Sequence, residues 1–348
     1  MKKFWRKMLS AVLAAVMMLS AATAVFAYEE FIPVEVFPIS TTFDGLDIEP
    51  ISEATDGVML VEVPAEEGAT QTSIDIAIDE LEENEGLNIS SFGIEVMIPA
   101  DMLENLSEKV AAIRFTFEEG KFSFMLLDAD GKEYVWRDSA NVVSVSVPYR
   151  LPMDISSHQV VLRHAEVGAV ARSYYADGKV YAELMQSGAY RISVESLGGY
   201  TDTIQKWMHT AAAYMTARGV ASGEDGLFKP SEQITREEFH MMLFKTLGTA
   251  DTLEEEDDSE LITRQEMMFL THSTMQVCDM LPEAMTMEWI VFDDWDDTVL
   301  GEYANAIQML CKLKIIGGTG NGQISANRIV TRAEAAQMLY NLLMYDKK

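Results

Sequence analysis

The sequence predicts an α+β protein of two domains, with an antiparallel β-rich domain of the sandwich type followed by an all-α module. From Leu87 to Val194, short runs rich in Val, Ile, Phe and Tyr alternate with turn residues, which is typical of antiparallel strands. From Tyr200 onward the apolar residues recur at helical spacing, and three similar helix-start motifs occur. The change of pattern near residue 198 places strands and helices in separate domains.

The N-terminus is interpreted as a secretory signal peptide that covers residues 1–27. Four basic residues precede an apolar run from Met8 to Leu19, and small residues continue to a small-x-small cleavage site after Ala27. A membrane anchor is the competing interpretation, but the run is short for a spanning helix and contains Ser10. We therefore expect a secreted protein with no membrane span after cleavage, retained noncovalently at the cell surface.

The composition is strongly acidic, with 26 Lys and Arg against 56 Asp and Glu and a net charge of −30. Four of the basic residues lie in the signal peptide, so the mature chain has 22 basic residues and a net charge of −34. Such a field repels a phosphate backbone, so nucleic acid is excluded as an expected partner. The two cysteines, Cys278 and Cys311, fall in helical patterns. Buried free thiols are the first expectation, and a disulfide between them is the alternative.

Two segments precede and interrupt the strands. Residues 28–70 contain four of the nine prolines and little periodicity, which predicts an extended lead-in with at most two strands. The β-rich domain is expected to span residues 71–197. It should contain one helix over Ser73–Glu83, where three apolar residues are in helical register, and a second from Ala100 to about Lys109.

Seven runs in the β-rich domain have the strand pattern. Several alternate strictly, as in Val143–Val147, so one face of the sheet is expected to be buried and the other solvated. Turn signals such as Asp177-Gly178 separate the runs and suit hairpins. The runs are Phe92–Ile98, Ala112–Phe117, Phe122–Leu127, Val142–Val147, Gln159–Arg163, Val180–Leu184 and Ala189–Val194.

The all-α module, residues 200–348, contains the same helix-start motif three times. A threonine and an arginine are followed, one residue later, by a glutamate, and an apolar helical pattern begins there. Such a motif forms a capping box and places an arginine in the first turn, beside free amides and the positive end of the helix dipole. An anion is expected to bind at such a position. The motifs are Thr235–Glu238, Thr263–Glu266 and Thr331–Glu334.

The first and third motifs belong to complete copies of an internal repeat. Thr331 lies 96 residues after Thr235, and each motif follows a glycine-rich loop, which is Gly219–Pro230 in the first copy. The second motif begins only 28 residues after the first, so its copy has lost the opening helix and the loop. We therefore expect repeats at about 200–248, 249–285 and 290–345, of which the middle one is degenerate.

These repeats resemble the S-layer homology domain, in which a Trp-started helix, a glycine-containing loop and a Thr-Arg-Ala-Glu helix start follow one another. The third copy contains that tetrapeptide unaltered at Thr331–Glu334. The resemblance implies an exported surface protein of Gram-positive bacteria whose three repeats form a pseudo-threefold helical bundle. The strand region is loosely similar to β-rich domains that precede such repeats, on the basis of Ile98–Leu103 and Tyr190–Val194.

The resemblance also implies a ligand and its binding residues. Grooves between the repeats are expected to bind secondary cell-wall polysaccharide, often through a pyruvate ketal, and other surface proteins are further candidate partners. We expect the principal site around Arg236 and the loop Gly219–Pro230, and the smallest contribution from the degenerate second repeat. The implied carboxylate binders are Arg236, Arg264 and Arg332, and the implied groove residues are Trp207, Gly223 and Gly318.

A search of the sequence for catalytic and metal-binding patterns gives no candidate. The five histidines lack the i, i+4 spacing of a zinc helix, and no serine lies in a nucleophile-elbow motif. Asp128–Gly131 begins like a calcium loop but lacks the closing glutamate, so a turn is expected. No enzyme activity, cofactor or metal is therefore expected. Two alternatives stay open: a structural module whose β-rich partner does the binding, and a cell-wall enzyme with its site in residues 28–200.

Overall fold

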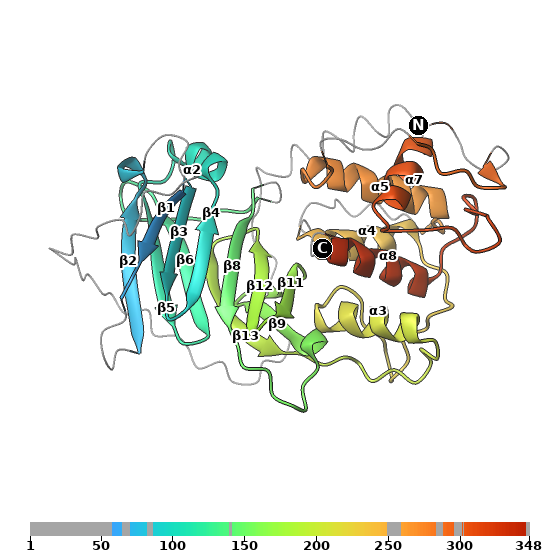
Figure 1. Ribbon diagram of the computed structural model, residues 1–348, viewed down its shortest axis with the longest axis horizontal. Helices are drawn as coiled ribbons and strands as arrows, with labels where there is room; N and C mark the ends of the chain where they lie inside the picture. The colour runs from blue at the N-terminus through green and yellow to red at the C-terminus, as the bar shows by residue number, and fades with distance from the viewer. Residues whose placement is uncertain are drawn as a thin grey trace.

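The computed structural model describes residues 58–64, 70–81, 86–138, 141–248, 259–282, 288–295, 301 and 303–345. The strands from 58 to 194 form one lobe and the helices from 206 to 345 form the other (Figure 1). The expected α+β class with a β-rich part followed by a helical part is therefore confirmed. The signal peptide and residues 28–57 of the lead-in lie outside the described residues.

The β domain consists of two sheets. The first has the strand order β1-β3-β4-β8-β12-β11 and is antiparallel except for the parallel pair of β1 and β3. The second has the order β10-β9-β13-β6-β5-β2, with β7 paired to β6. The strands of the first sheet are Val58–Glu62 (β1), Gly86–Ser91 (β3), Ile94–Ile98 (β4), Val143–Pro148 (β8), Ser173–Ala176 (β11) and Lys179–Leu184 (β12). Those of the second are Gln71–Ala77 (β2), Ala112–Glu118 (β5), Lys121–Leu127 (β6), Glu133–Tyr134 (β7), Val160–His164 (β9), Gly168–Ala169 (β10) and Gly188–Val194 (β13).

The core of the β domain lies between the two sheets. Along β5, every second side chain is fully buried, as Phe115 and Phe117 show, and Leu87 and Ile89 of β3 enter the same cluster from the other sheet. This alternation is what one buried face requires. Each of the seven predicted runs contains a strand.

The helix expected over Ser73–Glu83 is wrong. Residues 71–77 form β2, which pairs with β5 along its whole length, and only Ile78–Glu80 makes a single 3₁₀ turn, η2. The cross-strand partners explain the outcome, because Arg114 of β5 forms an ion pair with Asp75 at 2.7 Å and the β-branched isoleucines of β2 fit a pleated surface. The second expected helix is present as α2, Ala100–Leu106.

The helical module is built from pairs of helices. Helix α3 packs on α8 and α5 packs on α7, so the opening helix of one repeat covers the motif helix of another. The apolar faces enclose a second core, separate from that of the β domain. The helices are Lys206–Ala217 (α3), Arg236–Leu247 (α4), Arg264–Val277 (α5), Ala304–Lys312 (α7) and Arg332–Tyr345 (α8).

The residues just before the three motif helices close into a ring. The N–H of Ile234 donates to the carbonyl of Val330 (3.3 Å), Val330 donates to Ile262 (3.1 Å), and Ile262 donates back to Ile234 (3.2 Å). All three side chains are buried in the module's core. Three equivalent segments that bond head to tail in a closed cycle define the expected pseudo-threefold axis.

Two further expectations concern the helices. Cys278 and Cys311 are both buried free thiols, as first expected, rather than a disulfide. Among the helices that the structure describes, none combines the length and the apolar character needed to cross a bilayer.

Candidate functional site

The backbone amides at the three helix starts are bonded by the neighbouring repeat. The capping boxes of the first and second motifs form as predicted; for example, the Thr235 side chain accepts from Glu238 while the Glu238 carboxylate accepts from Thr235. The following amides of Gln265 and Ala333 are also bonded. The N–H groups of Arg236, Arg264 and Arg332 donate over 2.8–2.9 Å to the carbonyl oxygens of Glu260, Arg328 and Glu232. The expectation of free amides for an anion is therefore wrong at Arg264 and Arg332, and at both helix starts the arginine side chains are the candidate donors.

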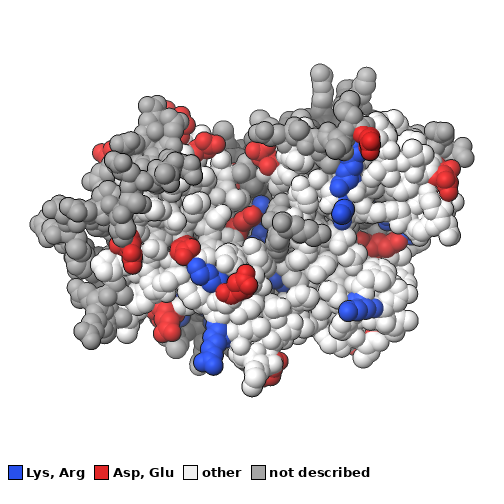
Figure 2. Space-filling model, in the orientation of Figure 1, with Lys and Arg blue, Asp and Glu red and all other residues white. Residues whose placement is uncertain are grey.

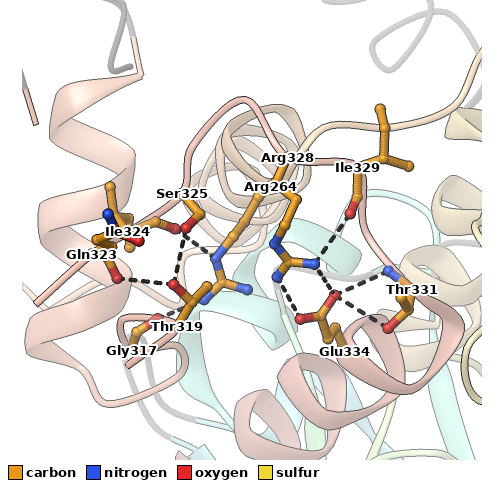
Figure 3. Close-up of polar contacts among 10 residues, drawn as sticks. All are labelled: Arg264, Gly317, Thr319, Gln323, Ile324, Ser325, Arg328, Ile329, Thr331 and Glu334. Carbon is orange, nitrogen blue, oxygen red and sulfur yellow. Dashed lines mark hydrogen bonds and ion pairs between the residues drawn. The ribbon is translucent and has the colours of Figure 1, made fainter. Parts of the chain in front are cut away.

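Arg264 is a buried cross-link between the second and third repeats. Its side chain reaches the glycine loop of the third repeat, where Nε donates to the carbonyl of Ile324 at 3.0 Å and Nη2 donates to that of Gly317 (Figure 3). The residue is only 5% exposed. Burial lowers the pKa of Arg264, although the nearby Glu334 carboxylate counteracts the shift. Two of its guanidinium nitrogens, Nε and Nη2, thus donate to protein carbonyls.

Arg332 occupies the equivalent position over the loop of the first repeat. Its Nη2 donates to the carbonyl of Ser222 at 2.7 Å, and the guanidinium carbon lies 5.1 Å from the centre of the Phe228 ring. Its Nε has no hydrogen-bond acceptor among the described residues. The side chain is partly exposed and forms no ion pair with a carboxylate in the described part of the chain. Arg332 is therefore the more accessible of these two guanidinium groups.

Arg236 differs from both, because acidic side chains surround it. Its Nη2 donates to the Glu266 carboxylate at 2.9 Å, and its Nη1 lies 3.5 Å from the Glu260 carboxylate. Glu266 is also the capping residue of the second motif. An arginine that already has a carboxylate partner offers less to a carboxylate ligand.

The structure corrects the expected pairing of arginines and loops. Around the threefold axis, the arginine of each repeat reaches the loop of the next one, so Arg332 and not Arg236 lies over the loop Gly219–Pro230. Arg264 reaches the third loop by the same rule. The rule assigns Arg236 to the second repeat, in whose sequence no such loop is found, and Glu260 and Glu266 are among its partners.

Gly223 and Gly318 occupy equivalent, crowded positions in the two loops. A Cβ at Gly223 would lie 2.2 Å from the Leu227 carbonyl oxygen and 2.4 Å from the Tyr200 ring. A Cβ at Gly318 would lie 2.7 Å from the Gln323 carbonyl oxygen. Glycine is therefore required at both positions because the loop folds back on itself and against an aromatic ring.

Sequence reasoning missed two residues that shape the first loop. The Tyr200 hydroxyl accepts from the N–H of Gly223 at 2.7 Å, and the Asp202 carboxylate accepts from the N–H groups of Phe228 and Lys229 at 2.9 and 2.7 Å. In the third repeat, Asp294 binds two loop amides in the same way. The signal was the aromatic-x-Asp spacing, which occurs as Tyr200-x-Asp202 and again as Phe292-x-Asp294.

The remaining candidate, Trp207, lies in the first turn of α3. Its ring is 39% exposed, and its Nε1 donates to the side chain of Gln205 at 2.6 Å. An exposed indole at the start of α3 is free to stack on a sugar face. Elsewhere, no group of His, Cys, Asp and Glu side chains among the described residues is arranged to hold a metal ion.

Comparison with known protein families matches the S-layer homology domain at residues 199–239 and 292–336. A search of curated proteins finds no match to the chain. The two matched segments enclose the first and third loops with their motifs, and the second motif at Thr263 lies outside both. The helical module therefore contains S-layer homology domains, which associate proteins with the cell wall at the cell surface, and it follows an N-terminal β-rich domain.

Proposed function

We propose that the chain is an exported, noncatalytic protein whose helical module anchors it by binding a carboxylate-bearing secondary cell-wall polysaccharide. The principal site is the groove formed by Arg332 and the loop Gly219–Pro230. One observation carries this assignment: Arg332 combines partial exposure of its side chain with the absence of a carboxylate partner among the described residues. Arg236 already has a carboxylate partner in Glu266, and Arg264 is buried and bonded to a loop carbonyl.

The chemistry of the groove suits a pyruvyl ketal on a sugar. A carboxylate can accept hydrogen bonds from the guanidinium of Arg332, and charge-assisted bonds of this kind are stronger than neutral ones. The Phe228 ring lies against the guanidinium, with its centre 5.1 Å from the guanidinium carbon. Trp207 supplies an additional aromatic surface at the start of α3.

The charge distribution favours a local site over long-range attraction. Figure 2 shows Lys and Arg scattered among Asp and Glu on the face in view, without one continuous basic patch. With a net charge of −30 for the full chain, an anionic polysaccharide gains nothing at long range. Affinity must therefore arise from short contacts to individual donors.

Binding to purified sacculi tests the proposal. Arg332→Ala is expected to weaken binding by about 1.5–3 kcal/mol, which corresponds to about 10- to 150-fold in Kd. Arg236→Ala is the matched control and should bind like the wild type. Sacculi from which ketal pyruvate has been removed by mild acid should bind the wild type as weakly as intact sacculi bind Arg332→Ala. Undiminished binding to the acid-treated sacculi would overturn the ligand assignment.

A second candidate function is supported by the same contacts. Arg264 is buried and bonded to two loop carbonyls, and Arg236 is paired with glutamates, so two of the three arginines have structural contacts. A module of this kind could serve assembly alone, with the β domain as the binding part. Wild-type binding by Arg332→Ala, together with retained binding by the isolated β domain, would favour this alternative.

A further inference from the structure

The two domains meet around a buried arginine at the end of α3. Arg218, 3% exposed, donates from Nε and Nη2 to the carbonyl oxygen of Ser173 (3.2 and 2.8 Å) and from Nη1 to that of His158 (3.1 Å). Ser173 begins β11 and His158 lies in η3, a 3₁₀ turn at Ser157–Gln159, so both acceptors belong to the β domain. Figure 1 shows α3 as the helix of its lobe that lies beside the ends of these strands.

The surroundings of Arg218 hold it in one position. Its guanidinium carbon lies 3.3 Å from the centre of the Tyr214 ring, and the Tyr214 hydroxyl donates to the same Ser173 oxygen. Burial lowers the pKa of Arg218 to about 10, so the side chain is still charged at neutral pH. A buried cation that depends on a few carbonyl oxygens tolerates little displacement, because loss of a bond is not replaced by water.

The same arginine is where α3 turns into the first glycine loop. Arg218 is the C-terminal cap of α3, and Gly219 follows with a left-handed φ of 67°. The N–H of Val220 bonds back to the Met215 carbonyl at 2.9 Å, so the turn is rigid. Ser222, which accepts the hydrogen bond from Arg332, is the fourth residue after Arg218.

The other part of the proposed groove, helix α8 with Arg332 at its start, also contacts the β domain. Arg332 begins α8, and Tyr340 lies about two turns further along this helix. The Tyr340 ring lies 5.1 Å from that of Tyr214 and 6.5 Å from that of His158, in edge-to-face arrangements. Both elements that form the groove, the loop after α3 and the start of α8, are thus continuous with parts that pack on the β domain.

The repeat fold alone does not require an arginine at this position. In the third repeat the equivalent C-terminal cap of α7 is Leu313, which packs against the module's own core. That loop reaches its arginine, Arg264, without a contact of the Arg218 kind. The charged cap therefore serves the contact between the domains.

We propose that docking of the β domain positions the wall-binding groove, with Arg218 as the positioning residue. The inference rests on the proposed function, since it concerns the affinity of the Arg332 groove. The β domain fixes Arg218 and Tyr340, and these fix the distance between the Ser222 loop and Arg332. Loss of docking should therefore weaken glycan binding although no ligand-contacting residue has changed.

Calorimetry on the full mature chain separates positioning from simple loss of fold. The probe is the soluble polysaccharide that muramidase releases from sacculi. Arg218→Leu introduces the side chain of the third repeat, and we expect Kd to rise at least about fivefold, the lower end of the usual coupling between sites, with an unchanged number of sites. A merely structural role would reduce the number of sites and leave Kd unchanged. Arg191→Leu, at an exposed position on β13, is the matched control.

A second variant approaches the interface from the β domain. His158→Ala removes the ring that contacts Tyr214 and Tyr340 but keeps the backbone acceptor, and a smaller rise in Kd is expected. X-ray scattering at the same pH reports whether the lobes have separated. Separated lobes with wild-type Kd would overturn the coupling while leaving the proposed function intact. Wild-type Kd for Arg332→Ala in the same titration would instead overturn the assignment of the groove.

Discussion

The Arg332 guanidinium and the Ser222 carbonyl oxygen are 110 residues apart in the chain and joined by a 2.7 Å hydrogen bond. This bond connects the third repeat to the first, and the bond from Arg264 to Gly317 connects the second to the third in the same way. Each of these contacts therefore joins the arginine of one repeat to the loop of the next. Arg236, whose following repeat has no glycine loop in the sequence, has the carboxylates of Glu260 and Glu266 among its partners instead.

The first prediction separates the structural arginine from the binding one. Arg264→Ala should lower the free energy of unfolding by about 1–3 kcal/mol, because it leaves the buried carbonyl of Ile324 without the Arg264 donor and also removes the bond to Gly317. Arg332→Ala removes one hydrogen bond at a partly exposed position and should change stability much less. Urea unfolding followed by circular dichroism measures both values. Equal destabilisation by the two substitutions would contradict the distinction.

The sequence was sufficient for those features that depend on local pattern. The capping boxes at Thr235 and Thr263 form as predicted, because their hydrogen bonds span only three residues. The strand runs were identified because alternation has a period of two. The helix prediction failed for residues 71–77 because the spacing of Ile74 and Ile78 fits a helix and a strand equally. Pairing with β5 decided between the two structures.

Features that depend on distant contacts could not be predicted. The spacing of the motifs shows that there are three arginines, but only the closed ring through Ile234, Ile262 and Val330 shows which loop each one meets. For the same reason, the sequence does not predict the role of Arg218, because its acceptors in Ser173 and His158 lie 45 and 60 residues away. One repeated signal was available and missed, the Tyr200-x-Asp202 pair.

The second prediction uses two adjacent glycines of the third loop. Gly318→Ala should destabilise the module by about 1–3 kcal/mol, because the added Cβ would lie 2.7 Å from the Gln323 carbonyl and 3.2 Å from the Phe292 ring. Gly317→Ala is the control, since its Cβ would meet no atom within 4 Å. Thermal unfolding of the two variants under identical conditions gives the comparison. If Gly317→Ala were the more damaging, the crowding argument would fail.

The third prediction concerns acid stability and His164 of β9. Nδ1 of this buried ring accepts from the backbone N–H groups of Glu166 and Val167, so the proton lies on Nε2, which donates to Ser187. Burial lowers the pKa of His164, while the bond to Ser187 partly counteracts the shift. Protonation of Nδ1 would point a donor at two donors. The folded state therefore takes up this proton less readily than the unfolded state.

The sign follows from that difference. Above the unfolded pKa of 6.5, both states are neutral and His164 causes no pH dependence. As the pH falls below 6.5, the unfolded state is protonated first and stability is lost, until the folded pKa is passed. Between pH 7.5 and pH 5.5, the free energy of unfolding measured in urea should fall less for His164→Gln than for the wild type. His209→Gln, at an exposed position, is the matched control substitution.

The last prediction concerns the two thiols and orders their reactivity. Burial raises the pKa of Cys311 to about 11, although the charge of Arg264 counteracts the shift, so about one thiol in a thousand is ionised at pH 8. Cys278 is also buried, but it borders a cleft of about 270 Å³ between the domains, lined by Arg172 and Tyr345 among others. Reagents that attack thiolates should therefore reach Cys278 first.

Ellman's reagent on the native chain should show one slow phase that Cys278→Ala abolishes and Cys311→Ala leaves in place. After unfolding in guanidinium without reductant, two thiols should react at once in the wild type, because both cysteines are free. Absence of reactive thiols in that unfolded sample would mean that the two cysteines are bridged. A native phase that belongs to Cys311 would mean instead that the end of α7 opens more readily than the cleft between the domains.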